Sequence, residues 1–270
     1  GRNFCSKIWN AFRLIKGWTV DDNIQAPDAA KLAVHWFESK QNEVAAEVAD
    51  LFSKYRLSEA LMAVYKLFWD EFSSWYLEMI KPAYGQGIDR TTYDATLCFL
   101  DNLLHLLHPF MPFITEELWQ QMYERNAEEG ESLMVSALSM DTYVDTAFVA
   151  QFEVVKGVIS NIRSIRLQKN IAQKEPLDLQ VLGENPVAEF NAVIQKMCNL
   201  SSITVVESKA EGASSFMVGT TEYAVPLGNM IDVEAEIARM EAELKHKEGF
   251  LQGVLKKLSN EKFVNNAPAA

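Results

Sequence analysis

The sequence predicts a mainly α-helical protein: a helical bundle, then a small α+β region, then a long C-terminal coiled-coil helix. Three observations support this fold class. Apolar residues recur every three to four positions through most of the first 125 residues. Short, alternating segments rich in β-branched residues appear only later, between residues 177 and 227. Near the end of the chain, the apolar spacing becomes that of a heptad repeat.

Composition places the chain among globular proteins. It is 270 residues long, with 49% hydrophobic and 23% charged residues. No run approaches the ~18 apolar residues of a membrane helix, and the mixed start GRNFCSKIWN is no signal peptide. The distant Cys5, Cys98 and Cys198 show neither zinc spacing nor an even disulfide set. We therefore expect a cytoplasmic protein with reduced thiols and, because it starts within a helical pattern without Met, a fragment of a longer one.

Two amphipathic helices are expected first. One spans residues 3–16 and stops at Gly17. Asp28 is a suitable N-cap for the other, which extends to about residue 54. Their inward positions are Phe4, Ile8, Phe12, Ile15, Leu32, Trp36, Val44, Val48 and Leu51.

A third and a fourth helix follow. Ser58 is the expected N-cap of the third, which Lys81-Pro82 ends. The fourth runs from about Asp89 to Leu107. Their inward positions are Leu61, Tyr65, Phe68, Phe72, Trp75, Met79, Tyr93, Leu97, Leu100, Leu104 and Leu107.

The stretch HPFMPFITEELW predicts a tight corner between two helices. Pro109 cannot continue the fourth helix and should push His108 towards an extended conformation. Pro112 can preset the first turn of the next helix. We expect Phe110 and Phe113 to plug the end of the bundle.

The pattern changes after residue 125. AEEGES is a polar break, and LMVSAL reads as a short extended segment. A helix, three strands and a shorter helix then make a small α+β unit. We expect the helices at 147–168 and 186–198, and the strands at 177–182, 202–208 and 221–227.

The last element is predicted to be one strand of a coiled coil. Apolar residues alternate in steps of three and four from Met230 to Leu258, with Lys247 as the one polar seam position. The expected parts of the chain are thus a bundle, an acidic linker, a small α+β junction region and a coiled-coil strand, at residues 1–125, 126–150, 151–228 and 229–270.

The distribution of charge matters more than its sum. A net charge of −12 argues at first sight against nucleic acid. Residues 1–16, however, carry four bases and no acid, and residues 154–174 carry five bases and no acid. Residues 126–150 carry five acids and no base. Local basic faces on an acidic body are compatible with binding a polyanion at chosen places.

The chain shows no recognisable catalytic or metal site. It has no glycine-rich phosphate loop and no nucleophile elbow. His105 and His108 lie three residues apart, but no third ligand is close in sequence. We expect no catalytic residue, no metal ligand and no cofactor in this chain.

The first helix combines the groups that single-stranded RNA recognition needs. Arg2 and Lys7 could contact phosphates, Asn3 and Asn10 base edges, and Phe4 a base face. An amphipathic core helix with a solvated basic face explains these residues equally well. Arg163 and Arg166, one turn apart in IRSIRLQK, could clamp phosphates or pair with acids of this acidic protein.

Five segments resemble valyl-tRNA synthetases. GRNFCSKIWNAFR is similar to the segment after their catalytic core, and YKLFWDEFSSWYLEMIKP to a helix that follows. HPFMPFITEELW resembles the corner shared by class I synthetases for valine, isoleucine and leucine. SNIRSIRLQKNI is similar to the junction region, and ARMEAELKHKEGFLQGVLKKLSNEKFVNNAP to the first strand of the coiled-coil arm.

The resemblance implies a helical-bundle anticodon-binding domain, an α+β junction and an arm whose return helix is missing. It implies tRNA(Val) as partner, no membrane, and a full-length enzyme, a monomeric ligase, that uses ATP and Mg²⁺. The two ATP signature motifs of the class are absent here. The chain alone should therefore not activate valine.

The resemblance also suggests tRNA-binding residues. For the anticodon these are Arg2, Asn3, Phe4, Lys7, Asn10 and Lys81. For the tRNA body they are Arg163, Arg166, Lys169, Lys245, Lys256 and Lys257.

Two alternatives stay open at this point. One is the same part of an isoleucyl- or leucyl-tRNA synthetase. The other is a non-enzymatic helical interaction module that recruits a partner through its coiled coil. Because the return helix of the arm is missing, the unpaired heptad seam also predicts weak self-association of this chain: a single amphipathic strand leaves its apolar side in water.

Overall fold

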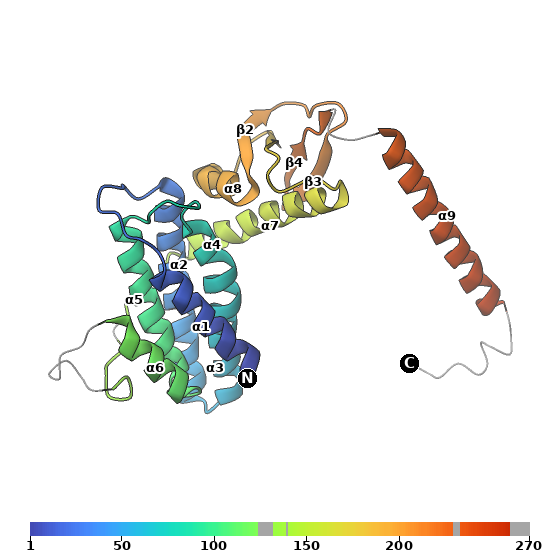
Figure 1. Ribbon diagram of the computed structural model, residues 1–270. Helices are drawn as coiled ribbons and strands as arrows, with labels where there is room; N and C mark the ends of the chain where they lie inside the picture. Colours follow the sequence, from blue (N-terminus) through green and yellow to red (C-terminus); the bar gives the residue numbers. More distant parts are fainter. Residues whose placement is uncertain (124–131, 139, 229–232, 260–270) are drawn as a thin grey trace.

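A bundle of helices, a small α/β unit and a separate C-terminal helix make up the computed structural model (Figure 1), which describes residues 1–123, 132–138, 140–228 and 233–259. The bundle contains α1 (Arg2–Lys16), α2 (Asp28–Ser53), α3 (Leu57–Lys66), the π-helix η1 (Leu67–Tyr76), α4 (Leu77–Ile80), α5 (Arg90–Leu107) and α6 (Pro112–Met122).

The third predicted helix is one rod with a π-helical middle. α3, η1 and α4 follow each other without a break. The wider turn is supported by the Ser74 hydroxyl, which donates to the carbonyl of Trp69, 2.9 Å away. Buried Phe68, Phe72 and Tyr76 succeed one another at ring distances of 5.5 Å. Sequence periodicity predicted an ordinary α-helix over these residues. π-helical turns often occur in functional segments.

An aromatic cluster at the centre joins α2, η1 and α5. The ring of Phe37 lies 5.3 Å from Phe72, 5.0 Å from Tyr76 and 5.2 Å from Phe99. The Tyr76 hydroxyl is satisfied by Thr96 at 2.8 Å. Most predicted inward positions are buried as expected; Leu61 is an exception and is exposed, because α3 packs on its other side through residues such as Ala60 and Val64.

The corner between α5 and α6 differs in detail from the prediction. Pro112 does begin α6. His108, however, is helical (φ −54°, ψ −42°), because its N–H still bonds the Leu104 carbonyl. Phe110 is half-buried against Phe52, but Phe113 is 91% exposed. The prediction that both rings plug the bundle is therefore wrong for Phe113, which points outward from the first turn of α6.

Both predicted N-caps are also wrong. Pro27 precedes α2, and Asp28 instead pairs with Lys31 at 3.1 Å. Arg56, not Ser58, precedes α3, and no side chain caps it. Asp89, for which no cap was predicted, caps α5 and accepts a hydrogen bond from the Thr92 N–H at 2.8 Å.

The α/β unit is a four-stranded sheet with α7 and α8 packed against it. Its elements are α7 (Thr146–Gln168), β1 (Leu177–Leu182), η2 (Ala188–Phe190), α8 (Asn191–Cys198), β2 (Leu200–Val206), β3 (Ser214–Val218) and β4 (Thr221–Val225). The strand order is β2-β1-β4-β3, with β1 and β2 parallel and the other pairs antiparallel. Gly157 lets α7 approach β3 closely, since a Cβ there would lie 3.0 Å from Val218.

Three segments correct or limit the predictions for this half. β3 was not predicted at all. LMVSAL forms turns rather than an extended segment. AEEGES falls largely on residues 124–131, outside the described residues.

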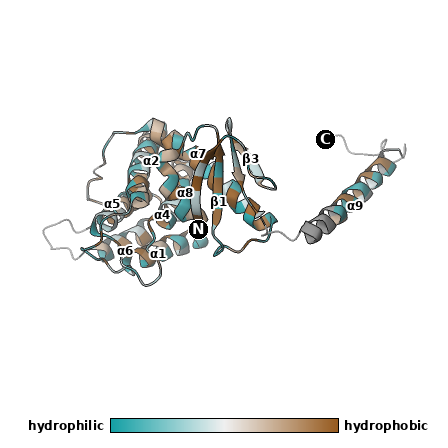
Figure 2. Cartoon of the chain, turned by 90° about the horizontal axis from the view of Figure 1, so that it is seen from above, coloured by the Kyte–Doolittle hydropathy of each residue, from teal (hydrophilic) through white to brown (hydrophobic). Residues whose placement is uncertain are grey.

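α9 (Val233–Leu258) stands apart from the rest of the described chain in both views (Figures 1 and 2). Leu244, Leu251 and Leu255 are each more than half exposed. The helix itself is as expected, while its pairing into a coiled coil stays a prediction. None of the described helices combines the length and the apolar character needed to cross a bilayer.

Candidate nucleic-acid interface

α1 presents its polar side from the surface of the bundle. The apolar stripe Phe4, Ile8, Phe12 and Ile15 is buried. This leaves the candidate residues Arg2, Asn3 and Asn10 exposed and Lys7 half-buried. The helix carries no acid, so its outer side keeps the positive charge predicted from the sequence.

Phe4 supports this surface from below as a buried core residue. Its ring packs 4.7 Å from Tyr65, 5.8 Å from Phe68 and 6.2 Å from Trp69. Because Phe4 is only 7% exposed, its ring serves the core rather than offering a face to a base. It fixes α1 against α3 and η1.

The aromatic surface is instead formed by Tyr65 and Trp69, which sequence reasoning did not select. Both are half-buried, and their rings stack with centroids 5.5 Å apart. Lys7 Nζ lies 5.0 Å from the Trp69 centroid, a cation–π distance. The available signal was the four-residue spacing of Tyr65 and Trp69 on one helix face.

A shallow groove continues from this cluster along α1. Its hollow of 180 Å³ is lined by Lys7, Asn10, Ala11, Leu14, Ser73, Leu77 and Glu78. Glu78, the one acid in the lining, approaches Lys81 Nζ to 4.0 Å. We call this surface, from Arg2 to Lys81, the α1 groove.

At the Lys81 end, the groove meets a larger hollow of 650 Å³ between residues 17–19 and 81–87. Lys196 of α8 reaches this end and donates to the Lys81 carbonyl at 3.0 Å. Burial lowers the pKa of Lys196, while Glu78 opposes this shift. Arg2 thus lies at the start of α1, and Lys81 lies near Gly17, just beyond its end.

Arg166 is a bracket inside the α/β unit. It is 1% exposed, and its guanidinium donates to four carbonyls at 2.7–3.2 Å. The acceptors lie in the loop after α7 and at the end of α8: Ala172, Glu175, Cys198 and Asn199. Its burial lowers the pKa of Arg166, and its nitrogens are turned towards protein carbonyls rather than towards a phosphate.

The neighbours of Arg166 differ in exposure. Arg163 is exposed and lies 5.6 Å from the Trp75 ring. Lys169 is half-buried. On α9, Lys245 and Lys256 are exposed, whereas the side chain of Lys257 is outside the described part.

Lys156 joins α7 to the bundle. Its ammonium lies 2.6 Å from Glu71 and 2.8 Å from Glu153. It also lies 5.3 Å from the Trp36 ring and 5.8 Å from the Trp75 ring. Lys156 and Glu71 are only 12% and 18% exposed, so this basic residue is committed to an internal ion pair.

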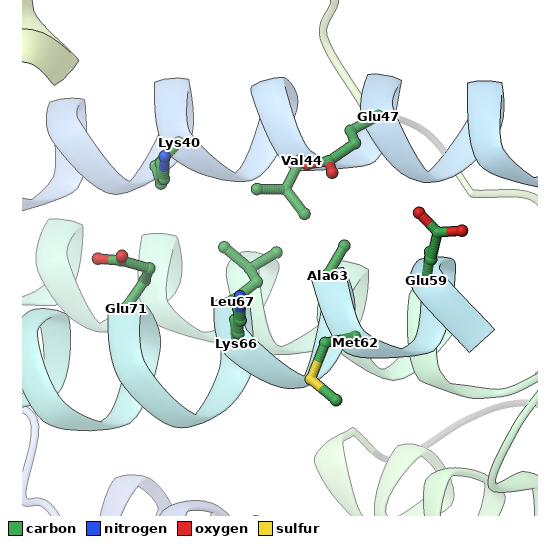
Figure 3. A pocket seen from close by; sticks show the side chains of 9 residues that line it. All are labelled: Lys40, Val44, Glu47, Glu59, Met62, Ala63, Lys66, Leu67 and Glu71. Atoms are coloured by element: carbon green, nitrogen blue, oxygen red, sulfur yellow. The ribbon is translucent and has the colours of Figure 1, made fainter. Parts of the chain in front are cut away.

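The groove between α2 and α3 has the opposite character (Figure 3). Its hollow of 380 Å³ is lined by three glutamates, two lysines and apolar side chains: Lys40, Val44, Glu47, Glu59, Met62, Ala63, Lys66, Leu67 and Glu71. Although burial opposes its charge, Glu43 at 2.7 Å holds the pKa of Lys40 above its usual value. Acids thus outnumber bases in a groove that offers little to a polyanion.

No metal-binding group of three or more His, Cys, Asp or Glu occurs in the described ranges. His105 approaches the Asp101 carbonyl and the Ser136 hydroxyl, whereas His108 approaches Thr115. The two histidines are therefore engaged separately.

Two family models match this chain. Residues 34–181 match the anticodon-binding domain of tRNA ligase. Residues 232–270 match the valyl tRNA synthetase tRNA binding arm.

Several similar proteins bear one name, valine--tRNA ligase. That of Bacteroides thetaiotaomicron is 99% identical over 270 residues, which are 100% of this chain and 31% of that protein. That of Phocaeicola vulgatus is 71% identical over 100% of this chain and 30% of that protein. That of Enterococcus faecalis is 35% identical over 98% and 32%. The chain thus spans about a third of the length of these relatives.

Proposed function

The chain belongs to the tRNA ligases, among them to the valyl-tRNA synthetase family, and on this premise we propose that it is the tRNA-holding part of a valine--tRNA ligase. It would bind tRNA(Val) by its anticodon and body in the cytoplasm. A catalytic core elsewhere in the protein would join valine to that tRNA with ATP and Mg²⁺. The observation that carries the proposal is the presence of two tRNA-binding family models on one chain.

The α1 groove is the surface that we propose for the anticodon. Lys7 and Lys81 would neutralise phosphates, and Arg2 would extend this row at the start of α1. Asn3 and Asn10 are exposed amides that can hydrogen-bond to base edges. Tyr65 and Trp69 add a stacked aromatic pair beside Lys7. Splayed single-stranded bases are recognised by this combination of groups.

The test is binding of the purified chain to a tRNA(Val) transcript, followed by fluorescence anisotropy. We expect binding to weaken when the three anticodon bases are exchanged. As a control on the protein, Lys40→Ala with Lys66→Ala in the α2–α3 groove should leave the affinity for tRNA(Val) unchanged. Equal affinity for the original and the exchanged anticodon would contradict anticodon recognition.

The chemistry of valylation is proposed to lie outside this chain. The sequence holds no nucleotide-binding signature, and the described residues form no metal cluster. Purified chain should therefore show no valine-dependent exchange of pyrophosphate into ATP. Robust exchange would overturn this assignment.

α9 is proposed to act as part of the arm that contacts the tRNA body, with the exposed Lys245 and Lys256 facing phosphates. Its exposed leucines predict weak self-association of this chain, although we expect the whole enzyme to be a monomer. Sedimentation across a concentration series, with and without residues 229–270, tests this. A strictly monomeric chain at high concentration would contradict it.

A further inference from the structure

The apolar seam of α9 is open to solvent in the described part of the chain. Leu244 and Leu251 are both more than half exposed. Between them the seam contains an exposed cation, Lys247, one helical turn before Leu251. An isolated amphipathic helix is marginal in water, because packing of its apolar face supplies most of its stability. The seam therefore favours a surface that offers apolar side chains beside negative charge.

Pairing of two copies of α9 with each other would satisfy this seam poorly. A lysine at a seam position lowers the stability of a coiled coil. Gly249 and Gly253 lie inside α9, and glycine is among the least favourable residues in a helix interior. A second α9 would bring the same weaknesses to the pair. A surface that is already folded and carries acids is a better partner.

The α2–α3 groove offers such a surface (Figure 3). Val44 and Leu67 are buried at its floor, and Met62 is half exposed at its edge. Glu47 of α2 and Glu59 of α3 lie together at one end of this apolar stretch. The groove thus places two carboxylates next to an apolar floor on walls that the bundle core supports.

The acidic end of the groove is accessible to a cation. Glu47 is exposed and makes no ion pair within the described residues. Glu59 pairs with Arg56, but both side chains are 53% exposed, so this pair contributes little. At the other end, Glu71 is committed to Lys156 at 2.6 Å. A cationic helix would therefore be held at the Glu47 end.

The spacing of the two surfaces agrees and sets a direction. Leu251 follows Lys247 by four residues, a rise of about 6 Å along α9. Val44 precedes Glu47 by three residues, a rise of about 4.5 Å along α2. The order of charge and apolar residue is reversed between the two helices. Opposite charges and apolar groups meet together only if α9 runs antiparallel to α2.

We propose that the α2–α3 groove takes α9 of a second copy of this chain. Lys247 lies at Glu47 and Glu59, and Leu251 covers Val44 and Leu67. A second copy supplies the helix, because α9 stands apart from its own bundle in both views (Figures 1 and 2). The inference rests on the weak self-association included in the proposed function and names the surface that carries it.

The test alters the two surfaces separately and then mixes the variants. Glu47→Lys with Glu59→Lys should lower self-association about 10-fold or more, since like charges then face each other. Lys247→Glu should lower it in the same way. A mixture of the two variants should associate again, because the unaltered arm of the first meets the unaltered groove of the second. Sedimentation velocity across a concentration series, with one variant fluorescently labelled, measures both effects.

The matched control is Glu38→Lys with Glu189→Lys, which makes the same change of charge at exposed acids outside the groove lining. It should leave self-association unchanged. Melting followed by circular dichroism checks that the groove variant is folded. Undiminished association of the groove variant, or a mixture that fails to associate, would overturn the docking while tRNA(Val) binding stands. If the unaltered chain is strictly monomeric, its proposed self-association fails and the docking with it, whereas anisotropy judges tRNA binding independently.

Discussion

Residues 1–16 and 154–174 look alike in the sequence, because both are amphipathic stretches with several bases and no acid. In the structure they differ. α1 keeps Arg2 exposed and Lys7 half-buried beside an aromatic ring. α7 places Lys156 in a shielded ion pair and Arg166 in a fully buried bracket.

The difference follows from how many sides of each helix are covered. α1 packs on the bundle with one side and leaves the other to solvent. α7 lies between the bundle and the sheet, so cations on two of its sides meet protein (Figure 1). A buried charge is tolerated only when it is paired or fully hydrogen-bonded. The same local charge pattern can thus produce a binding surface or an internal joint.

The largest effect is expected for Arg166→Leu. The substitution removes the Arg166 donor from four carbonyls in the loop after α7 and at the end of α8. Those of Ala172 and Asn199 keep a backbone donor, whereas those of Glu175 and Cys198 depend on Arg166. Each buried acceptor left unsatisfied costs about 1–3 kcal/mol of unfolding free energy, so the summed loss should exceed that of the other variants. Urea denaturation measures it. The exposed Arg163→Leu is the matched control and should change stability by less than about 1 kcal/mol.

Cys198 offers a local reporter of the same bracket. Its carbonyl accepts from Arg166, and burial raises the pKa of its thiol to about 12. Because the thiolate is the reactive form, Cys198 should resist iodoacetamide at pH 8 in the unaltered chain. It should become labelled in Arg166→Leu. Equal protection in both proteins would contradict the bracket.

A smaller effect is expected for Lys156→Met. Methionine keeps the contact with Trp36 and Trp75 but leaves Glu71 without its partner. Since the pair is slightly exposed, we expect a loss of about 2–3 kcal/mol, below the range for a fully buried pair. Adding Glu71→Gln should restore part of the loss. If the double variant is no more stable than Lys156→Met, the ion pair is not what holds α7 to the bundle.

The smallest effect on stability, and the clearest on RNA, is expected for Arg2→Ala with Lys7→Ala. Loss of the cation–π contact of Lys7 costs about 0.5–1 kcal/mol. Each lost phosphate contact on a single strand lowers the slope of log affinity against log salt by about 0.7. Anisotropy titrations of tRNA(Val) at several salt concentrations measure the slope. If the variant has the same slope as the unaltered chain, Arg2 and Lys7 do not contact phosphates and α1 is a structural helix only.

Much of the fold could be predicted from the sequence, because helical periodicity and turn residues act locally. The ends of α1, α2, α5 and α7, and β1 from Leu177 to Leu182, agree with the prediction to within two residues. β3 was missed since it is short and the apolar Met217 lies on its exposed side, which breaks the alternation of apolar and polar residues. The N-caps at Asp28 and Ser58 failed because a local capping preference is weaker than the path that tertiary packing imposes on the preceding loop.

The same distinction between local sequence pattern and tertiary packing applies to the candidate site. The sequence by itself determined that basic and amide side chains lie on the open side of α1, since the apolar stripe from Phe4 to Ile15 leaves them no other side. Only the tertiary structure decided that Phe4 is core, that Trp69 lies beside Lys7, and that Arg166 is internal. These assignments depend on which element covers which face, and residues far apart in sequence make that contact. Burial is therefore a property of the packed chain, and charge becomes a binding surface only where packing leaves it in water.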